Sequence, residues 1–232
     1  MTRTLIVTGA SKGLGAHVSR RAIEEGYRVV GLARNFDDTH KFSDHFEPVV
    51  CDVTDPERLR EVAKSKRRDD EIYGVINCAG VASMNLAVST PASTIDKLIN
   101  TNLLGTIHSS IQFGKLLARK KRGRIINFST IAVALSLKGE SIYVASKAGV
   151  EGFSRTFARE MADFNVTVNC IAPGPIDTQL IAGVPKASIN KIVEQQIIPR
   201  KAKPEDVWKV ISMLLDDRSD MITGEILNLG GA

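Results

Sequence analysis

A strand, a glycine-rich turn and a helix follow one another at the start of the chain, and this order restricts the possible folds most. Residues 4–8 are apolar and β-branched and predict a buried strand. Gly9-Ala-Ser-Lys-Gly-Leu-Gly15 follows, and a helical pattern then ends at Gly26. Such a turn lets backbone N–H groups approach a phosphate, while the positive end of the helix attracts the anion. The unit predicts a nucleotide site, and an ordinary tight turn is the alternative.

The alternation of strand and helix continues along the chain. Further strands are predicted at residues 27–32, 48–51, 72–77, 124–128, 166–171 and 225–229, and helices at about 55–66, 93–118, 141–161 and 204–215. The expected fold class is α/β, a Rossmann-like doubly wound parallel sheet of about seven strands with helices on both faces. The early glycine turn favours this open sheet over a closed barrel.

Length and composition fit one domain over residues 1–232. The chain has 232 residues, of which 43% are apolar, and it contains no Pro/Gly/Ser-rich linker. No apolar stretch resembles a signal peptide or a membrane span, so we expect a cytoplasmic protein without membrane contacts. Cys51, Cys78 and Cys170 are far apart, which favours reduced core thiols, and we expect no metal site.

The net charge of +5 is concentrated in one segment. Residues 119–124 contain five basic side chains, as many as the whole excess. Such a run is typical of a solvated helix end, where cations complement the helix dipole. The alternative is a docking site for an acidic partner. No aromatic residues interleave with these charges, so we expect no nucleic-acid binding.

Tyr143 and Lys147 are the first candidate catalytic pair. They lie four residues apart at the start of a predicted helix, so both side chains are on one face. A cation close to a phenol favours phenolate and can make the tyrosine a working general acid. The alternative is a tyrosine at the edge of the core beside a solvated lysine.

Motifs spread over essentially the whole chain resemble those of the short-chain dehydrogenase/reductase family. They occur in the family's order and at its spacings: Thr8-Gly-Ala-Ser-Lys-Gly-Leu-Gly15, Asn77-Cys-Ala-Gly80, Asn102, Tyr143-x-x-x-Lys147, Pro173-Gly174 and Thr178. In an open sheet these motifs all fall at the carboxyl ends of strands, where ligands bind.

The resemblance implies a role for each candidate catalytic residue. Tyr143 donates the proton to a substrate carbonyl, or accepts one when an alcohol is oxidised. Lys147 lowers the pKa of Tyr143 and holds the nicotinamide ribose. Asn102 distorts the long helix locally and anchors a water molecule in the proton path. An asparagine bonded only within its helix is the alternative.

The hydroxyl that orients the carbonyl departs from the family pattern. The family usually has a serine thirteen positions before the tyrosine, where this chain has Thr130, directly after Ser129. A threonine supplies the same donor, although its methyl group narrows the pocket. We expect Thr130 to take this role, and Ser129 is the alternative.

The charges near the adenosine ribose predict NADP(H) as the cofactor. An NAD site places a carboxylate after the second strand, whereas a 2′-phosphate requires cations. This chain has Arg34 there and Lys12 in the glycine turn; a solvated Arg34 is the alternative. The predicted cofactor contacts are Gly9, Ser11, Lys12, Gly13, Leu14, Gly15, Arg34, Asp52, Val53, Asn77, Ala79, Gly80, Tyr143, Lys147, Pro173, Gly174, Ile176 and Thr178.

The substrate side of the site is expected to be apolar. The candidate wall residues are Met84 after the fourth strand, Val133 and Leu135 before Tyr143, and Leu180, Ile181 and Val184 in a substrate loop at about residues 178–200. The overall pattern most resembles bacterial 3-oxoacyl-[acyl-carrier-protein] reductases. It implies NADPH-dependent reduction of a ketone to a secondary alcohol, most of all a carrier-linked 3-oxoacyl thioester. A dehydrogenase or reductase of another small ketone or alcohol and a non-catalytic dinucleotide sensor are the alternatives.

The same resemblance implies two kinds of partner. An acyl carrier protein is expected to dock on Lys121 and Arg122, although Phe164 stands where another cation is expected. A homotetramer is also expected, with the helices around Asn102 and Tyr143 packing across a two-fold axis.

Overall fold

A parallel sheet forms the centre of the molecule. The computed structural model describes the chain except for residues 1, 38–42, 70, 179 and 181–183. Within the described residues, seven parallel strands are ordered β3-β2-β1-β4-β5-β6-β7. The strands are β1 (Thr4–Thr8), β2 (Arg28–Ala33), β3 (Phe46–Val50), β4 (Ile72–Asn77), β5 (Gly123–Phe128), β6 (Val166–Pro173) and β7 (Ile226–Leu229). The expected doubly wound sheet is confirmed.

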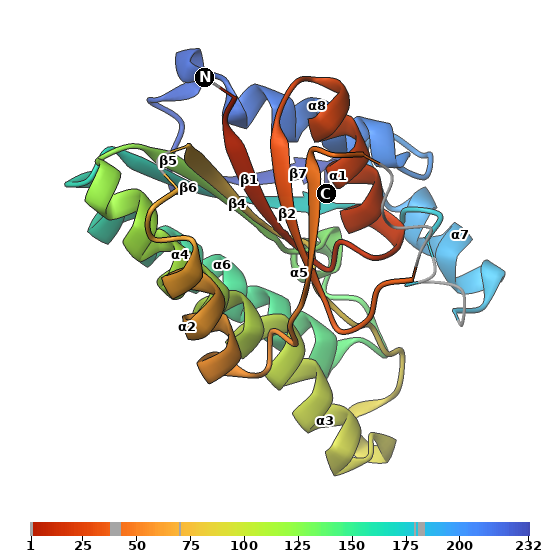
Figure 1. Ribbon diagram of the computed structural model, residues 1–232. Helices are drawn as coiled ribbons and strands as arrows, with labels where there is room; N and C mark the ends of the chain where they lie inside the picture. The colour runs from red at the N-terminus through yellow and green to blue at the C-terminus, as the bar shows by residue number, and fades with distance from the viewer. Residues whose placement is uncertain (1, 38–42, 70, 179, 181–183) are drawn as a thin grey trace.

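Helices cover both faces of the sheet (Figure 1). They are α1 (Gly13–Glu24), α2 (Pro56–Ser65), α3 (Ala92–Leu98), α4 (Gly105–Lys120), α5 (Ile131–Leu135), α6 (Ser141–Ala162), α7 (Lys186–Glu194) and α8 (Pro204–Leu215). Figure 1 shows α2, α4 and α6 on one face and α1 and α8 on the other.

The side chains of β1 explain why both faces are covered. Leu5 and Val7 pack with α1 and α8, whereas Ile6 packs with α2, α4 and α6. All three are fully buried, because successive side chains of a strand point to opposite faces. A continuous apolar run is therefore the expected pattern for a strand between two helical layers.

The strand order reverses beside β1, and this reversal positions the site. β1 pairs with β2 on one side and with β4 on the other. Chain segments that leave β1 and β4 therefore diverge to opposite faces and leave a crevice at the carboxyl ends. The glycine turn follows β1, and Cys78-Ala79-Gly80 follows β4.

Three helical features add detail to the expected pattern. The long helix expected at about residues 93–118 is interrupted by a π-helical turn at Ile99–Leu104. The short helix α5 follows β5 directly and was not predicted. Helix α7 occupies part of the expected irregular loop, where it buries Ile189 and Ile192 at a spacing of three residues.

Candidate active site

The glycine turn closes tightly around its own backbone. Gly9 has φ +69°, and a Cβ there would lie 2.9 Å from the Ala79 backbone. A Cβ on Gly15 would lie 2.2 Å from the carbonyl oxygen of Gly9. Thr8 also crosses the crevice, because its hydroxyl accepts a hydrogen bond from the Ala79 N–H at 3.1 Å. The first turn of α1 carries no acidic residue, so an anion meets no repulsion there.

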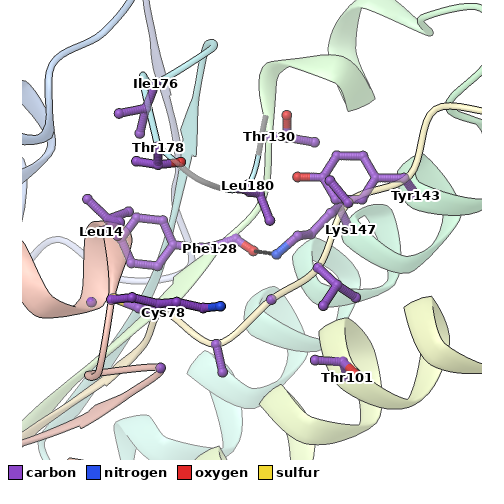
Figure 2. Close-up of a pocket in the computed structure, with 18 of the residues that line it drawn as sticks. Leu14, Cys78, Thr101, Phe128, Thr130, Tyr143, Lys147, Ile176, Thr178 and Leu180 are labelled. Atoms are coloured by element: carbon purple, nitrogen blue, oxygen red, sulfur yellow. Dashed lines mark hydrogen bonds between the residues drawn. The ribbon is translucent and has the colours of Figure 1, made fainter. Parts of the chain in front are cut away.

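A pocket of about 870 Å³ extends from this turn across the carboxyl ends of the strands. It is lined by the glycine turn, the segments after β2 and β4, the start of α5, and Tyr143 and Lys147 of α6 (Figure 2). Its volume falls within the range of about 300–1,000 Å³ that is usual for ligand sites.

The predicted cofactor contacts line this pocket with one exception. The lining includes Gly9, Ser11, Lys12, Gly13, Leu14, Gly15, Arg34, Asp52, Val53, Ala79, Gly80, Tyr143, Lys147, Pro173, Gly174, Ile176 and Thr178. Asn77 is absent from it, and its prediction as a cofactor contact is corrected. Its amide nitrogen donates to Ser110 Oγ at 2.9 Å and to Asn127 Oδ1 at 2.8 Å. Asn77 therefore joins β4 to β5 and α4 inside the protein.

Lys12 and Arg34 are exposed cations at the edge of the pocket. Lys12 directly precedes α1, and Arg34 directly follows β2. Asp37 and Asp52 line the pocket as well, so the cations share this region with carboxylates. The two positive charges that the sequence singled out thus border the same pocket.

The hydroxyls of Tyr143 and Thr130 face the same part of the pocket, as Figure 2 shows. Thr130 lies close enough for its hydrogen bonding to lower the pKa of the phenol. Its hydroxyl also caps α5 by accepting from the Ala132 N–H at 3.3 Å. Ser129 borders the pocket too, but its hydroxyl donates to Glu151 Oε1 at 2.6 Å. Of the two neighbouring hydroxyls, the one of Thr130 is therefore directed to the tyrosine.

The pKa of Tyr143 is raised, and the predicted lowering by Lys147 is corrected. Burial is the main cause because it disfavours the charged phenolate, and the carboxylate of Glu140 adds to it. Lys147 makes no resolved contribution. Its ammonium donates instead to the Phe128 carbonyl oxygen at 2.9 Å. The phenol consequently stays protonated at neutral pH, which is the form that a proton donor needs.

Lys147 itself is a buried cation with a lowered pKa. Only 6% of the residue is exposed, and burial lowers its pKa from 10.5 to about 8. Figure 2 shows its side chain beneath Tyr143, within the pocket. An ammonium of this kind is charged at pH 7 and begins to lose its proton in the mildly alkaline range.

Asn102 lies in the π-helical turn, as the expected local distortion requires. Its side chain accepts from the Val81 N–H at 2.8 Å and donates to the Val81 carbonyl at 2.9 Å and to Ser146 Oγ at 3.1 Å. These bonds leave the helix, so the alternative of an asparagine bonded only within it is excluded. A Cβ on Gly80 would lie 3.4 Å from Asn102 Oδ1 and 3.7 Å from Lys147 Nζ, so both side chains lie close to this glycine. A water anchor at Asn102 stays a prediction.

The substrate wall differs in part from the expected one. Met84, Leu180 and Val184 line the pocket, whereas Val133 and Leu135 do not and are corrected. They lie on α5, whose pocket-facing residues are Ile131 and Ala132. Ile181 lies outside the described residues. The lining residues that the sequence reasoning missed include Leu137, Glu140, Ile189 and Ile192.

Lys121 and Arg122 lie away from the pocket of their own chain. They connect the carboxyl end of α4 to the start of β5, whereas the pocket lies at the carboxyl ends of the strands. Both side chains are exposed, and so is Phe164 after the end of α6. Carrier docking on Lys121 and Arg122 stays a prediction.

The described residues contain no group of three or more His, Cys, Asp or Glu side chains arranged to hold a metal ion. Cys51, Cys78 and Cys170 are free thiols. In the part of the chain that the structure describes, no helix is long and apolar enough to cross a membrane.

Comparison with known proteins places this fold and site in a family. A family model described as "Enoyl-(Acyl carrier protein) reductase" matches residues 9–231. The chain is 30% identical to the 3-oxoacyl-[acyl-carrier-protein] reductase of Thermotoga maritima, over 99% of this chain and 96% of the relative. The chain therefore belongs to the short-chain dehydrogenase/reductase family of oxidoreductases.

Other relatives include both carrier-protein and sugar enzymes. The 3-oxoacyl-[acyl-carrier-protein] reductase of Escherichia coli is 29% identical over 97% of this chain and 95% of its own. A solved structure of ElxO with NADP bound has a TM-score of 0.89 and 27% identity, and covers 98% of this chain and 97% of its own. Aldohexose dehydrogenase of Thermoplasma acidophilum, in ligand-free form, has a TM-score of 0.87 and 26% identity, covering 99% and 93%.

Proposed function

We propose that this protein reduces a ketone to a secondary alcohol with NADPH, and that its substrate is a 3-oxoacyl thioester. One observation carries the proposal. A buried, protonated Tyr143 shares the pocket with Thr130 and Lys147, and the same pocket continues to a glycine turn that is open to an anion. The single domain over residues 1–232 and the expected homotetramer belong to the proposal.

The pocket residues fit NADPH. The Gly9 to Gly15 turn leaves no room for side chains where its backbone closes, so N–H groups are free to face a pyrophosphate. Lys12 and Arg34 offer two cations for a 2′-phosphate. The named carbonyl reductases and the structure with NADP bound support this assignment. NADPH supplies a hydride to the carbonyl carbon when it is bound.

The protein's own residues supply the proton and the orientation. Thr130 donates a hydrogen bond to the substrate carbonyl oxygen, which polarises it. Tyr143 donates its proton to the same oxygen as negative charge develops there. The Lys147 ammonium, in the same pocket, returns a proton to the tyrosinate that remains. Asn102 holds Val81 and Ser146 in place, so it positions the wall around this path.

The relatives that act on carrier-linked substrates support a thioester. Lys121 and Arg122 lie at the opposite edge of their own chain from its pocket, so they would guide a carrier to a neighbouring subunit of the tetramer. Charge reversal at Lys121 should then raise KM for the carrier-linked substrate and leave KM for a free thioester unchanged. Equal effects on both substrates would remove docking from the proposal.

NADPH absorbance tests the proposed function directly. The purified protein is given an acetoacetyl thioester and, separately, a panel of simple ketones. Fast oxidation with the thioester supports the proposal. NADPH oxidation with a simple ketone but not with the thioester supports the alternative, a reductase of another small ketone. Tight NADPH binding without oxidation of any substrate supports a dinucleotide sensor.

A further inference from the structure

Glu140 places a carboxylate on the substrate side of the pocket, beside Tyr143. Glu140 directly precedes α6 and lies three residues before Tyr143. Helix side chains lean toward the N-terminus, so Tyr143 leans toward Glu140. Glu140 lines the pocket and is partly buried. Its charge acts on the phenol of Tyr143, so the two groups are close.

The Glu140 carboxylate has no partner among the residues that the structure describes. Within the described part of the chain, no hydrogen bond or ion pair to either of its oxygens is found, and it does not cap α6. Burial alone raises its pKa, because the carboxylate lacks a compensating cation. A partly buried acid without a donor is costly, since buried polar groups are normally hydrogen-bonded.

The surroundings make this acid unusual. Apolar side chains, including Met84, Leu137 and Leu180, line the same pocket. The loop that carries it is fixed, because the Asn85 N–H donates to the Gly139 carbonyl at 2.8 Å and the Glu140 N–H to the Leu137 carbonyl at 3.2 Å. The carboxylate is therefore held in the pocket, next to the proposed proton donor.

We propose that Glu140 is a specificity-determining residue that accepts a hydrogen bond from an N–H or O–H group of the substrate. The inference rests on the proposed function, because it concerns the carbonyl compound that Tyr143 reduces. Two sources offer such a donor within reach: the amide N–H of the arm that carries a thioester, or a hydroxyl near the ketone. An unsubstituted alkyl ketone offers none.

Two pairs of substrates distinguish these sources. The first pair is the N-acetylcysteamine thioester of acetoacetate and its N-methyl amide, which lacks the N–H. The second pair is 4-hydroxy-2-butanone and 2-pentanone, which have similar shapes. The wild-type protein should prefer the donor member of one pair by about tenfold to a hundredfold in kcat/KM, the range that one hydrogen bond to a charged group supplies. The preferred pair identifies the source of the donor.

Variants test whether Glu140 causes the preference. Glu140→Met keeps the length of the side chain and removes the acceptor. The ratio of kcat/KM values within the preferred pair should therefore fall to about one. Glu140→Gln keeps a neutral acceptor and should retain a part of it, while an unchanged circular dichroism spectrum and NADPH affinity show that both variants fold. The control is Glu160→Gln, which changes an exposed acid of the same helix and should leave the ratio unchanged.

Other results overturn the inference. Equal rates within both pairs, or a preference that persists in Glu140→Met, would show that Glu140 accepts no hydrogen bond from the substrate. The proposed function would still stand. Absence of NADPH oxidation with all four substrates would reject the selectivity together with the carbonyl reduction itself.

Discussion

The two halves of the pocket are built in different ways. The half beside β1 consists of backbone: Gly15 packs against the Gly9 carbonyl oxygen, and Gly9 packs against the Ala79 backbone. The half beside α6 consists of side chains, namely Thr130, Tyr143 and Glu140 among apolar neighbours. Backbone recognition suits a phosphate that many relatives share, whereas side chains distinguish substrates. Changes in the two halves should therefore alter different quantities.

Replacement of Thr130 should affect turnover and leave NADPH affinity unchanged. Thr130→Ala removes a donor to the developing oxyanion, so kcat should fall about 100-fold to 1,000-fold. Thr130→Ser keeps the hydroxyl and the cap of α5 and should retain most activity. Ser129→Ala should have a much smaller effect, because its hydroxyl is bonded to Glu151. The reverse ranking in steady-state assays would assign the carbonyl-orienting role to Ser129.

Replacement of Gly15 should affect cofactor binding first. The new Cβ of Gly15→Ala would meet the Gly9 carbonyl oxygen at 2.2 Å, so the turn must open. Such forced shifts cost about 1–3 kcal/mol, which weakens NADPH binding roughly tenfold to a hundredfold in a titration. Gly152→Ala is the control, because a Cβ on this helical glycine meets nothing within 4 Å. Unchanged NADPH affinity in Gly15→Ala would place the pyrophosphate elsewhere.

Reversal of the charge at Arg34 should change the choice between cofactors. Arg34→Asp replaces a cation for the 2′-phosphate with a carboxylate, so the preference for NADPH over NADH should fall by about tenfold or more. The measurement is the ratio of the two kcat/KM values. An unchanged ratio would make Arg34 a solvated loop residue and leave the choice to Lys12.

The buried ammonium of Lys147 should make stability depend on pH. Its pKa in the folded protein, about 8, lies below the ordinary value of 10.5. Between these pH values the unfolded chain binds more protons, so the free energy of unfolding rises with pH in this window. The gain is on the order of 1 kcal/mol per pKa unit. Denaturant titrations without NADPH at pH 7.5 and 10 should show this rise in the free energy of unfolding in the wild type and not in Lys147→Met. An equal change of the free energy of unfolding with pH in both proteins would contradict the assignment.

The backbone half and the strand order follow from the sequence far better than the substrate half. Glycines and a strand-helix alternation predict a turn from local geometry, and their neighbours in space follow from the parallel sheet. The family resemblance implies that Asn77 contacts the cofactor, but its side chain donates to Asn127 inside the protein. Sequence spacing does not show whether the hydrogen-bond partner of a polar side chain lies in the pocket or in the protein interior.

The substrate half depends on tertiary contacts that no short pattern contains. Val133 and Leu135 were assigned to the wall without the helix α5, which turns them away from the pocket. The spacing of Ile189 and Ile192 in α7 was a usable signal, whereas Glu140 gave none. The pKa of Tyr143 was predicted from Lys147 alone, but burial determines its direction.

Tyr143→Phe tests the central claim most directly, because this substitution removes one oxygen and keeps the ring. NADPH binding and single-turnover oxidation by an accepted ketone should be measured in the same preparation. The account predicts unchanged NADPH affinity and a rate of oxidation about 100-fold to 10,000-fold lower, the contribution of a general acid. Oxidation at the wild-type rate in Tyr143→Phe would contradict the assignment of Tyr143 as the proton donor.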